Sequence, residues 1–211
     1  MQKASISESV IRRLPRYYRF LSALEHAGIQ RTSSRELAQQ LGLTASQIRQ
    51  DLNCFGEFGQ QGYGYNVSAL RRQLRLIIGL SQSRPAIIVG AGNLGRVIAA
   101  NIDFAAYGFC LTGIFDIDQK ICGTEIAGFT VAHMDTLEEF CRRVQPMVAV
   151  LCIPQEAAQE TADRLMELGI SGFWNFSHCD LDADHSRIQV ENVHLGDSLM
   201  TLSYRMPKID E

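Results

Sequence analysis

Three glycines with the spacing Gly-x-Gly-x-x-Gly follow a short apolar run at residues 86–89. Gly90 permits a tight turn, Gly92 lets the backbone approach a pyrophosphate, and Gly95 allows a helix to pack closely on the preceding strand. The N-terminus of that helix would offer unpaired N–H groups and a positive dipole end to phosphate oxygens. The loop is therefore predicted to bind a dinucleotide. Its predicted binding residues are Gly90, Ala91, Gly92, Asn93, Leu94 and Gly95.

An acidic residue ends the next apolar run, and its carboxylate could hold the ribose of that nucleotide. Asp116 lies 21 positions after Gly95, close to the spacing of about 20 at which nucleotide-binding units carry an acid. A carboxylate there accepts hydrogen bonds from the adenosine ribose and repels a 2′-phosphate, so the sequence favours NAD over NADP. Alternatively, Asp116 is a turn or capping residue, because Asp118 lies in the same loop.

The remaining polar residues show no arrangement that indicates catalysis. The five histidines occur in no H-E-x-x-H or triad-like setting, and His178, Cys179 and His185 make a poor candidate for a metal site. A hydride-transferring enzyme also needs a substrate domain and a positioned acid or base, and little chain follows the nucleotide-binding part. We therefore predict neither an enzyme nor a metal site. A small NAD-dependent oxidoreductase stays open as an alternative.

Alternating apolar and amphipathic segments indicate the elements that position this loop. Strand, helix and strand follow one another from about residue 85 onward, which predicts a parallel sheet with helices on both faces. The expected fold of this part is a doubly wound α/β (Rossmann) domain. A last helix is expected at residues 197–206, with Leu199, Leu202 and Met206 on one stripe. A helix that ends at about residue 101 is expected after the strand at 86–89, and the other expected strands and helices lie at residues 110–115, 135 onward, 147–153, 155–168 and 171–176.

The first part of the chain indicates short helices instead. Ser33 and Glu36 have the spacing of a capping box for a helix at 35–41, which Gly42 would end, and Thr44 would open the next helix. Two short helices joined by a glycine-containing turn predict a helix-turn-helix. Alternatively, they are two core-packing helices of an ordinary helical domain.

Glycines and aromatic residues alternate at residues 55–65, which predicts a tight β-hairpin directly after the helix-turn-helix. The aromatic residues favour a packed wing over a flexible linker, because Phe58 and Tyr63 would otherwise be exposed. An amphipathic helix from Ser68 and a polar linker at 79–84 follow. The domain boundary is therefore expected near residue 83, which gives a winged-helix domain at residues 1–83.

The charges of the chain are unevenly distributed. The 211 residues include 20 Lys and Arg against 23 Asp and Glu, but residues 1–83 carry 11 basic and 5 acidic residues. A basic part joined to an acidic remainder indicates that one end of the molecule contacts a polyanion. Chance clustering on solvated faces is the alternative.

The cysteines and the apolar runs indicate a cytoplasmic protein. The six cysteines form no C-x-x-C pair, which favours reduced thiols, with a thiol sensor as a minor alternative. No run of about twenty apolar residues is present and the N-terminus has no signal-peptide core, so no contact with a membrane is expected.

Segments along nearly the whole chain resemble the Rex family of redox-sensing repressors. The resemblance implies a homodimer whose C-terminal segment, residues 194–211, is a helix exchanged between the subunits, with an NAD(H)-binding Rossmann domain at residues 84–193. It implies a repressor that leaves its double-stranded DNA operator when NADH, the sensed ligand, binds. The matching segments are residues 12–19, 31–34, 47–52, 55–59, 62–65, 90–95, 115–118, 172–176 and 190–193.

The resemblance also implies which residues contact DNA. The recognition helix would place Arg49 against a base or phosphate in the major groove. Family members usually carry Lys or Arg in place of Gln50 and a basic residue in the wing, so weaker phosphate contact is expected here. A nucleotide-binding regulator that has lost DNA binding is thus a further alternative. The implied DNA-binding residues are Arg31, Ser46, Gln47, Arg49, Gln50, Gln60 and Gln61.

The family further links an Arg near the first domain to a Tyr of the NAD domain and an Asp of the exchanged helix. Arg19 matches the Arg, whereas Ile102 and His194 stand in the other two places, as read from an ungapped comparison. A histidine in that relay could add pH sensitivity. His178 replaces a proline that the family usually has after an Asn-Phe strand end, near the expected nicotinamide pocket.

Overall fold

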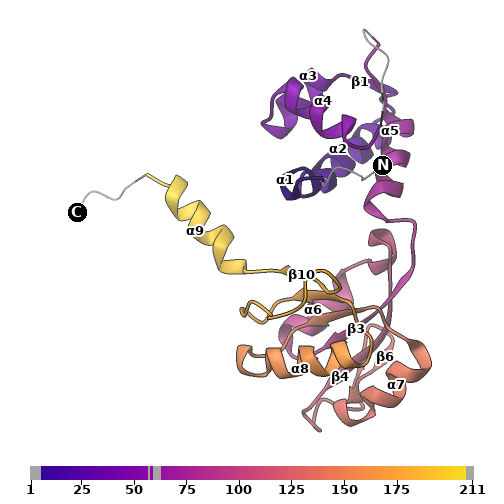
Figure 1. The fold of residues 1–211 in the computed structure, drawn as a ribbon, viewed down its shortest axis with the longest axis vertical. Coiled ribbons are helices and arrows are strands. Elements are labelled where there is room, and N and C mark those ends of the chain that lie inside the picture. The colour runs from indigo at the N-terminus through magenta and orange to yellow at the C-terminus, as the bar shows by residue number, and fades with distance from the viewer. Residues whose placement is uncertain (1–5, 57, 59–62, 208–211) are drawn as a thin grey trace. The chain divides into compact units, whose positions relative to one another are not determined.

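The computed structural model of the chain describes residues 6–56, 58 and 63–207, and it divides into two compact units, Met1–Gln82 and Ser83–Glu211. The first unit is mainly helical, and the second contains a six-stranded sheet (Figure 1). Within the described ranges, no helix is long and apolar enough to cross a membrane.

Two helices of the first unit, α3 and α4, are capped by the residues that the sequence predicted, and their bounds lie within two residues of those expected. The Ser33 hydroxyl accepts a hydrogen bond from the backbone amide of Glu36, and the Glu36 carboxylate accepts one from the amide of Ser33, which confirms the capping box. Gly42 ends the helix with φ of +67°. Thr44 caps the next helix by accepting from the amide of Gln47. The elements are α1 (Glu8–Ile11), α2 (Leu14–His26), β1 (Arg31–Thr32), α3 (Ser34–Leu41), α4 (Ala45–Asn53), β2 (Tyr65–Asn66) and α5 (Val67–Ile78).

Residues 57 and 59–62 of the hairpin predicted for residues 55–65 lie outside the described residues, so the hairpin stays a prediction. β2 pairs antiparallel with β1, so that Tyr65 lies opposite Thr32. The reason is the close approach at Gly64, which has φ of +69° and where a Cβ would lie 2.5 Å from the Thr32 carbonyl oxygen. Gln60 and Gln61, expected at the wing tip, lie outside the described residues.

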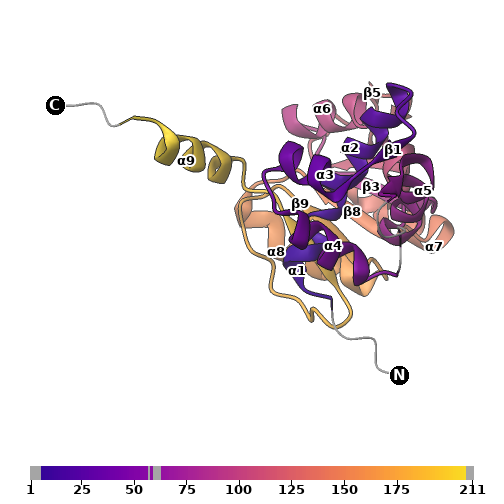
Figure 2. The ribbon, with the colours of Figure 1, turned by 90° about the horizontal axis from the view of Figure 1, so that it is seen from above.

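The second unit is a parallel sheet in the strand order β10-β9-β8-β3-β4-β7. Numbered by their order along the chain, these strands are 6-5-4-1-2-3, the order typical of doubly wound dinucleotide-binding folds. The predicted Rossmann fold is thus confirmed. β3, β8 and β9 lie side by side in the middle of the sheet (Figure 2). The strands are β3 (Arg84–Val89), β4 (Phe109–Asp116), β7 (Ala132–His133), β8 (Val148–Leu151), β9 (Gly172–Asn175) and β10 (Gln189–Asn192).

Helices cover both faces of this sheet, as the sequence predicted. Ile87 and Val89 of β3 belong to one buried cluster, which includes residues of α7 and α8, whereas Ile88 belongs to a second cluster with Ile98 of α6. This split follows from the alternation of side chains along a strand. The remaining elements are α6 (Asn93–Asn101), η1 (Phe104–Tyr107), β5 (Glu125–Ile126), β6 (Phe129–Thr130), η2 (Met134–Thr136), α7 (Leu137–Val144), α8 (Gln155–Glu167) and α9 (Leu195–Arg205).

Candidate dinucleotide and nucleic-acid sites

The glycine loop connects the carboxyl end of β3 to the N-terminus of α6. Two of the positions in this region can be occupied only by glycine. Gly90 has φ of +97°, and a Cβ there would lie 2.4 Å from the carbonyl oxygen of Cys152. A Cβ on Gly95 would lie 1.9 Å from the carbonyl oxygen of Gly90. These two glycines therefore allow the loop and the first turn of α6 to pack directly on each other.

Gly92 differs from the other two glycines, because a Cβ added there would meet no atom within 4 Å. It is the N-cap residue of α6, and no side chain of the described residues caps the helix at this point. Asn93 is exposed and Leu94 half-buried. The loop thus leaves an open space in front of uncapped helical amides, which fits a pyrophosphate.

Asp116 lies at the end of β4, with its carboxylate against this loop. Its Oδ2 accepts a hydrogen bond from the amide of Ala91 at 2.6 Å, and its Oδ1 accepts one from the amide of Asp118 at 2.8 Å. The residue is therefore also a turn residue, as the alternative supposed. A carboxylate has lone pairs for about four hydrogen bonds, so both oxygens can still accept from ribose hydroxyls.

The sequence analysis overlooked Arg96 beside this loop. Arg96 lies in the first turn of α6, and its Nε donates to the carbonyl oxygen of Ala91 at 2.9 Å. Its guanidinium is a cation held next to the space in front of Gly92, where it would favour a bound anion. The signal in the sequence is the basic residue directly after the glycine motif.

Cys152, whose carbonyl oxygen lies against the glycine loop, has a poorly nucleophilic thiol. Cys152 follows β8, and its carbonyl oxygen contacts Gly90. Burial raises the pKa of the Cys152 thiol to about 12, and burial also raises the pKa of Cys141. A thiol with a raised pKa is a poor nucleophile at neutral pH, so neither cysteine supports the thiol-sensor alternative.

His178 adopts a backbone conformation that proline cannot adopt. Its φ is +60°, whereas the proline ring holds φ near −65°. The His178 ring lies 6.2 Å from that of His194, and His194 Nε2 lies 3.4 Å from Asp180 Oδ1. The loop after β9 therefore has a shape in this chain that depends on the absence of the proline.

The helix α4 presents a polar face to solvent. Ser46, Arg49 and Gln50 are exposed, Gln47 is half-buried, and Ile48 and Leu52 are buried. α3 and α4 pack on each other as the two helices of the predicted helix-turn-helix. The sequence analysis missed Asn53, which is exposed on the same face, and the helical period of 3.6 residues would have placed it there.

Two arginines of the first unit are held in defined positions. Nη1 of Arg49 donates to the Ser34 hydroxyl at 3.1 Å, which ties the α4 face to the start of α3. Nη1 of Arg31 donates to the carbonyl oxygen of Tyr63 at 2.9 Å, and its guanidinium lies 5.9 Å from the Tyr63 ring centroid. Each guanidinium is thereby held by a contact with another segment of the first unit.

The three residues of the implied relay lie in different elements. Arg19 is an exposed residue of α2 in the first unit. In the second unit, Ile102 ends α6 and packs against the core, and His194 directly precedes α9. Their action as a relay stays a prediction.

Comparisons with known proteins agree with this division of the chain. A family model described as "Putative DNA-binding protein N-terminus" matches residues 5–53, and one described as "CoA binding domain" matches residues 81–179. The curated protein named "Redox-sensing transcriptional repressor Rex" from Thermoanaerobacter pseudethanolicus is 51% identical over 205 residues, which are 97% of this chain and 91% of that protein.

Two solved structures of the protein RSP are similar along nearly the whole chain. RSP in complex with β-NAD+ and operator DNA matches with a TM-score of 0.90 and 50% identity, covering 96% of this chain and 93% of RSP. RSP in complex with β-NADH matches with a TM-score of 0.89 and 48% identity, covering 96% and 94%. Identity of this extent over both units shows the family, and the chain belongs to the Rex family of redox-sensing transcriptional repressors.

Proposed function

We propose that this chain represses transcription by binding operator DNA through α4 and that it leaves the DNA when NADH binds at the glycine loop. The observation that carries this proposal is the 50% identity, over 96% of the chain, to RSP solved with NAD+ and operator DNA. A second RSP structure, which contains NADH, supports the part of the proposal that concerns the sensed ligand.

The exposed face of α4 suits the major groove of B-DNA, which admits one α-helix. Arg49 can donate two hydrogen bonds to a guanine or contact a phosphate, and Gln50 and Asn53 can read a base edge or a phosphate. Arg31, whose guanidinium is held by the carbonyl oxygen of Tyr63, is proposed to contact DNA as well. Gln60 and Gln61 are proposed to contact DNA from the wing.

The proposed cofactor site uses the open space at Gly92. The α6 amides and Arg96 would bind the pyrophosphate, and Asp116 would accept hydrogen bonds from the adenosine ribose. NAD(H) would serve here as a bound signal, so no catalytic residue is required. The relatives are named as repressors rather than enzymes, and we infer that this chain catalyses no hydride transfer.

Release from DNA requires a second copy of the chain. α9 has no buried residue, although it carries large apolar side chains such as Leu199, Met200 and Leu202. An isolated helix of 11 residues is marginal in water, so we infer that a second copy covers it in a homodimer. NADH would then favour a dimer whose two recognition helices no longer fit successive major grooves.

The proposal is tested by fluorescence anisotropy with the operator duplex that RSP binds, titrated with NADH and separately with NAD+. We expect the chain to bind this duplex and to leave it at low concentrations of NADH, while NAD+ has little effect. Binding that is indifferent to both cofactors would contradict the redox response. No binding at low salt to this duplex or to promoter fragments of the source genome would contradict repression itself.

A further inference from the structure

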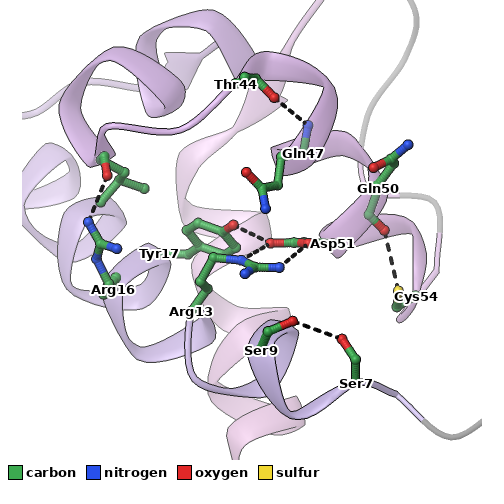
Figure 3. Close-up of polar contacts among 11 residues, drawn as sticks. Ser7, Ser9, Arg13, Arg16, Tyr17, Thr44, Gln47, Gln50, Asp51 and Cys54 are labelled. Atoms are coloured by element: carbon green, nitrogen blue, oxygen red, sulfur yellow. Dashed lines mark hydrogen bonds and ion pairs between the residues drawn. The ribbon is translucent and has the colours of Figure 1, made fainter.

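The recognition helix α4 is attached to α2 by a buried ionic cluster of three residues (Figure 3). Nε and Nη2 of Arg13 donate to Oδ2 and Oδ1 of Asp51 at 2.6 and 2.8 Å. The Tyr17 hydroxyl donates to Oδ2 of Asp51 at 2.5 Å. Asp51 is only 3% exposed, so a charged residue of α4 is buried between the guanidinium of Arg13, the N-cap residue of α2, and the hydroxyl of Tyr17 within α2.

The three hydrogen bonds of this cluster fix the orientation of the Asp51 carboxylate. An arginine fork on a carboxylate fixes distance and orientation together, and the Tyr17 hydroxyl adds a third direction. The apolar contacts of Ile48 and Leu52 bury α4 just as well, but dispersion and burial are non-directional and tolerate small rotations. Among the described contacts of α4, the Arg13–Asp51 pair is therefore the one that best defines the rotation of α4 about its own axis.

Rotation of α4 matters because Arg49 and Gln50 directly precede Asp51 on the same helix. Side chains at the surface of a helix lie about 5–6 Å from its axis. A rotation of about 20° would thus move them by roughly 2 Å, whereas recognition needs positions held within about 0.5 Å. Small changes at Asp51 would be transmitted to the outward face without unfolding the helix.

We propose that Arg13, Tyr17 and Asp51 are positioning residues for operator recognition, which set the rotation of α4 and so the direction of Arg49 and Gln50. This inference rests on the proposed function, because it concerns how the DNA-binding face is presented. If the cluster merely stabilised the fold, its replacement by apolar residues would leave the recognition of the operator unchanged. Since burial of a salt bridge costs desolvation, its replacement by apolar residues of similar size often leaves stability unchanged.

The test is a triple variant of the full chain, Arg13→Met, Tyr17→Phe and Asp51→Leu, which removes the cluster without leaving a buried charge. We measure its Tm, its affinity for NADH, and the ratio of its affinities for the RSP operator duplex and for a scrambled duplex of equal length. The expected result is a Tm close to that of the wild type, unchanged NADH affinity, and a ratio at least tenfold lower. An unchanged ratio would overturn the proposal.

Arg13→Lys is the second variant, because it keeps the charge and loses the two-pronged geometry. It too should lower the ratio, and an unchanged ratio would count against the proposal even if the triple variant fails to fold. The control is Arg71→Met with Glu25→Leu, which removes an ion pair between α5 and α2 that lies outside this cluster. This control should keep the ratio of the wild type, and an equal loss there would overturn the inference.

Measurements on the wild-type chain distinguish a failure of the proposed function from a failure of the positioning role. If it does not prefer the operator over the scrambled duplex, the proposed function fails, and this inference fails with it. If it prefers the operator and the variants do so equally, only the positioning role is wrong.

Discussion

The backbone amide of Ala91 donates a hydrogen bond to Oδ2 of Asp116 at 2.6 Å. This contact joins two features that lie 25 positions apart, the glycine loop and the acid at the end of the second strand. A ligand that binds the carboxylate is thereby brought to the uncapped N-terminus of α6. The phosphate and ribose parts of the proposed cofactor site are thus one surface.

Replacing Asp116 by alanine should weaken NADH binding by about 10- to 150-fold, because hydrogen bonds to a charged acceptor contribute roughly 1.5–3 kcal/mol. The preference for NAD over NADP should also decrease, since the charge that repels a 2′-phosphate is gone. Isothermal titration with each nucleotide measures both effects. Asp163→Ala on α8, whose carboxylate accepts only a surface hydrogen bond from Gln159 among the contacts described, is the control. Unchanged affinities in Asp116→Ala would mean that the residue only stabilises its turn.

Gly92→Ala and Gly95→Ala should affect different properties, the first NADH affinity and the second stability. The methyl group at position 92 points into open space, so Tm should stay near that of the wild type while NADH affinity falls at least tenfold. The methyl group at position 95 would lie 1.9 Å from the Gly90 carbonyl oxygen, so the second unit should lose stability. Calorimetry and NADH titration of both variants measure these effects. Tight NADH binding by Gly92→Ala would place the pyrophosphate elsewhere.

Arg49→Ala and Gln50→Lys should change the affinity for DNA in opposite directions. Arg49→Ala should weaken operator binding by about 1–3 kcal/mol if the guanidinium contacts a base. Gln50→Lys should tighten binding to any duplex and steepen the dependence of log K on log salt by about one, because a phosphate contact is added. Anisotropy titrations at several salt concentrations measure both slopes. Gln39→Ala, at an exposed position of α3, serves as the control. An unchanged slope for Gln50→Lys would place residue 50 away from the DNA backbone.

The stability of the first unit should depend on Asp51 in acid. Burial alone would raise the pKa of Asp51, but the hydrogen bonds from Arg13 and Tyr17 outweigh burial and lower it below its ordinary value. A lowered pKa contributes stability above the unfolded value of about 3.9, and that stability is lost as pH falls through the folded value. Asp51→Asn should therefore cost roughly 3–5 kcal/mol at pH 7.

The cost of Asp51→Asn should shrink steadily below about pH 4, because the carboxyl group takes up a proton in the unfolded wild-type chain there, which removes the stability that the lowered folded-state pKa contributes. Denaturant titrations of both proteins from pH 7 to pH 3 measure this difference. Asp163→Asn is the control, since Asp163 is exposed on α8 and accepts a surface hydrogen bond from Gln159. A gap between wild type and Asp51→Asn that is independent of pH would contradict an ionised Asp51 in the cluster.

A charge on the apolar stripe of α9 should abolish the proposed dimer. Leu199 is 68% exposed in a single chain, so Leu199→Glu should not disturb the fold of one chain but would place an unpaired charge in an interface. Sedimentation velocity should show two chains per particle for the wild type and one for the variant. Ser203→Glu, also exposed on α9, tests whether any added charge has this effect. A dimeric Leu199→Glu would move the interface away from this stripe.

Much of this protein follows from short-range signals in the sequence. Ser33, Gly42 and Thr44 cap helices through contacts with residues at most five positions away, and such contacts depend little on the rest of the fold. The alternation of strands and helices is also visible in the sequence, and it restricts the second unit to a parallel sheet. Family membership and the identity of the glycine loop were therefore predictable.

The tertiary structure decided the contacts between distant residues. The helical pattern of α4 gives no reason for a charged residue such as Asp51 to be buried. Its partners are Arg13 and Tyr17, which lie 38 and 34 positions away in the sequence. β2 pairs with β1, more than 30 positions earlier in the sequence, because strand pairing depends on which edge lies near in space. β10 likewise joins the sheet beside β9. Such pairings depend on long-range packing, which sequence periodicity does not encode.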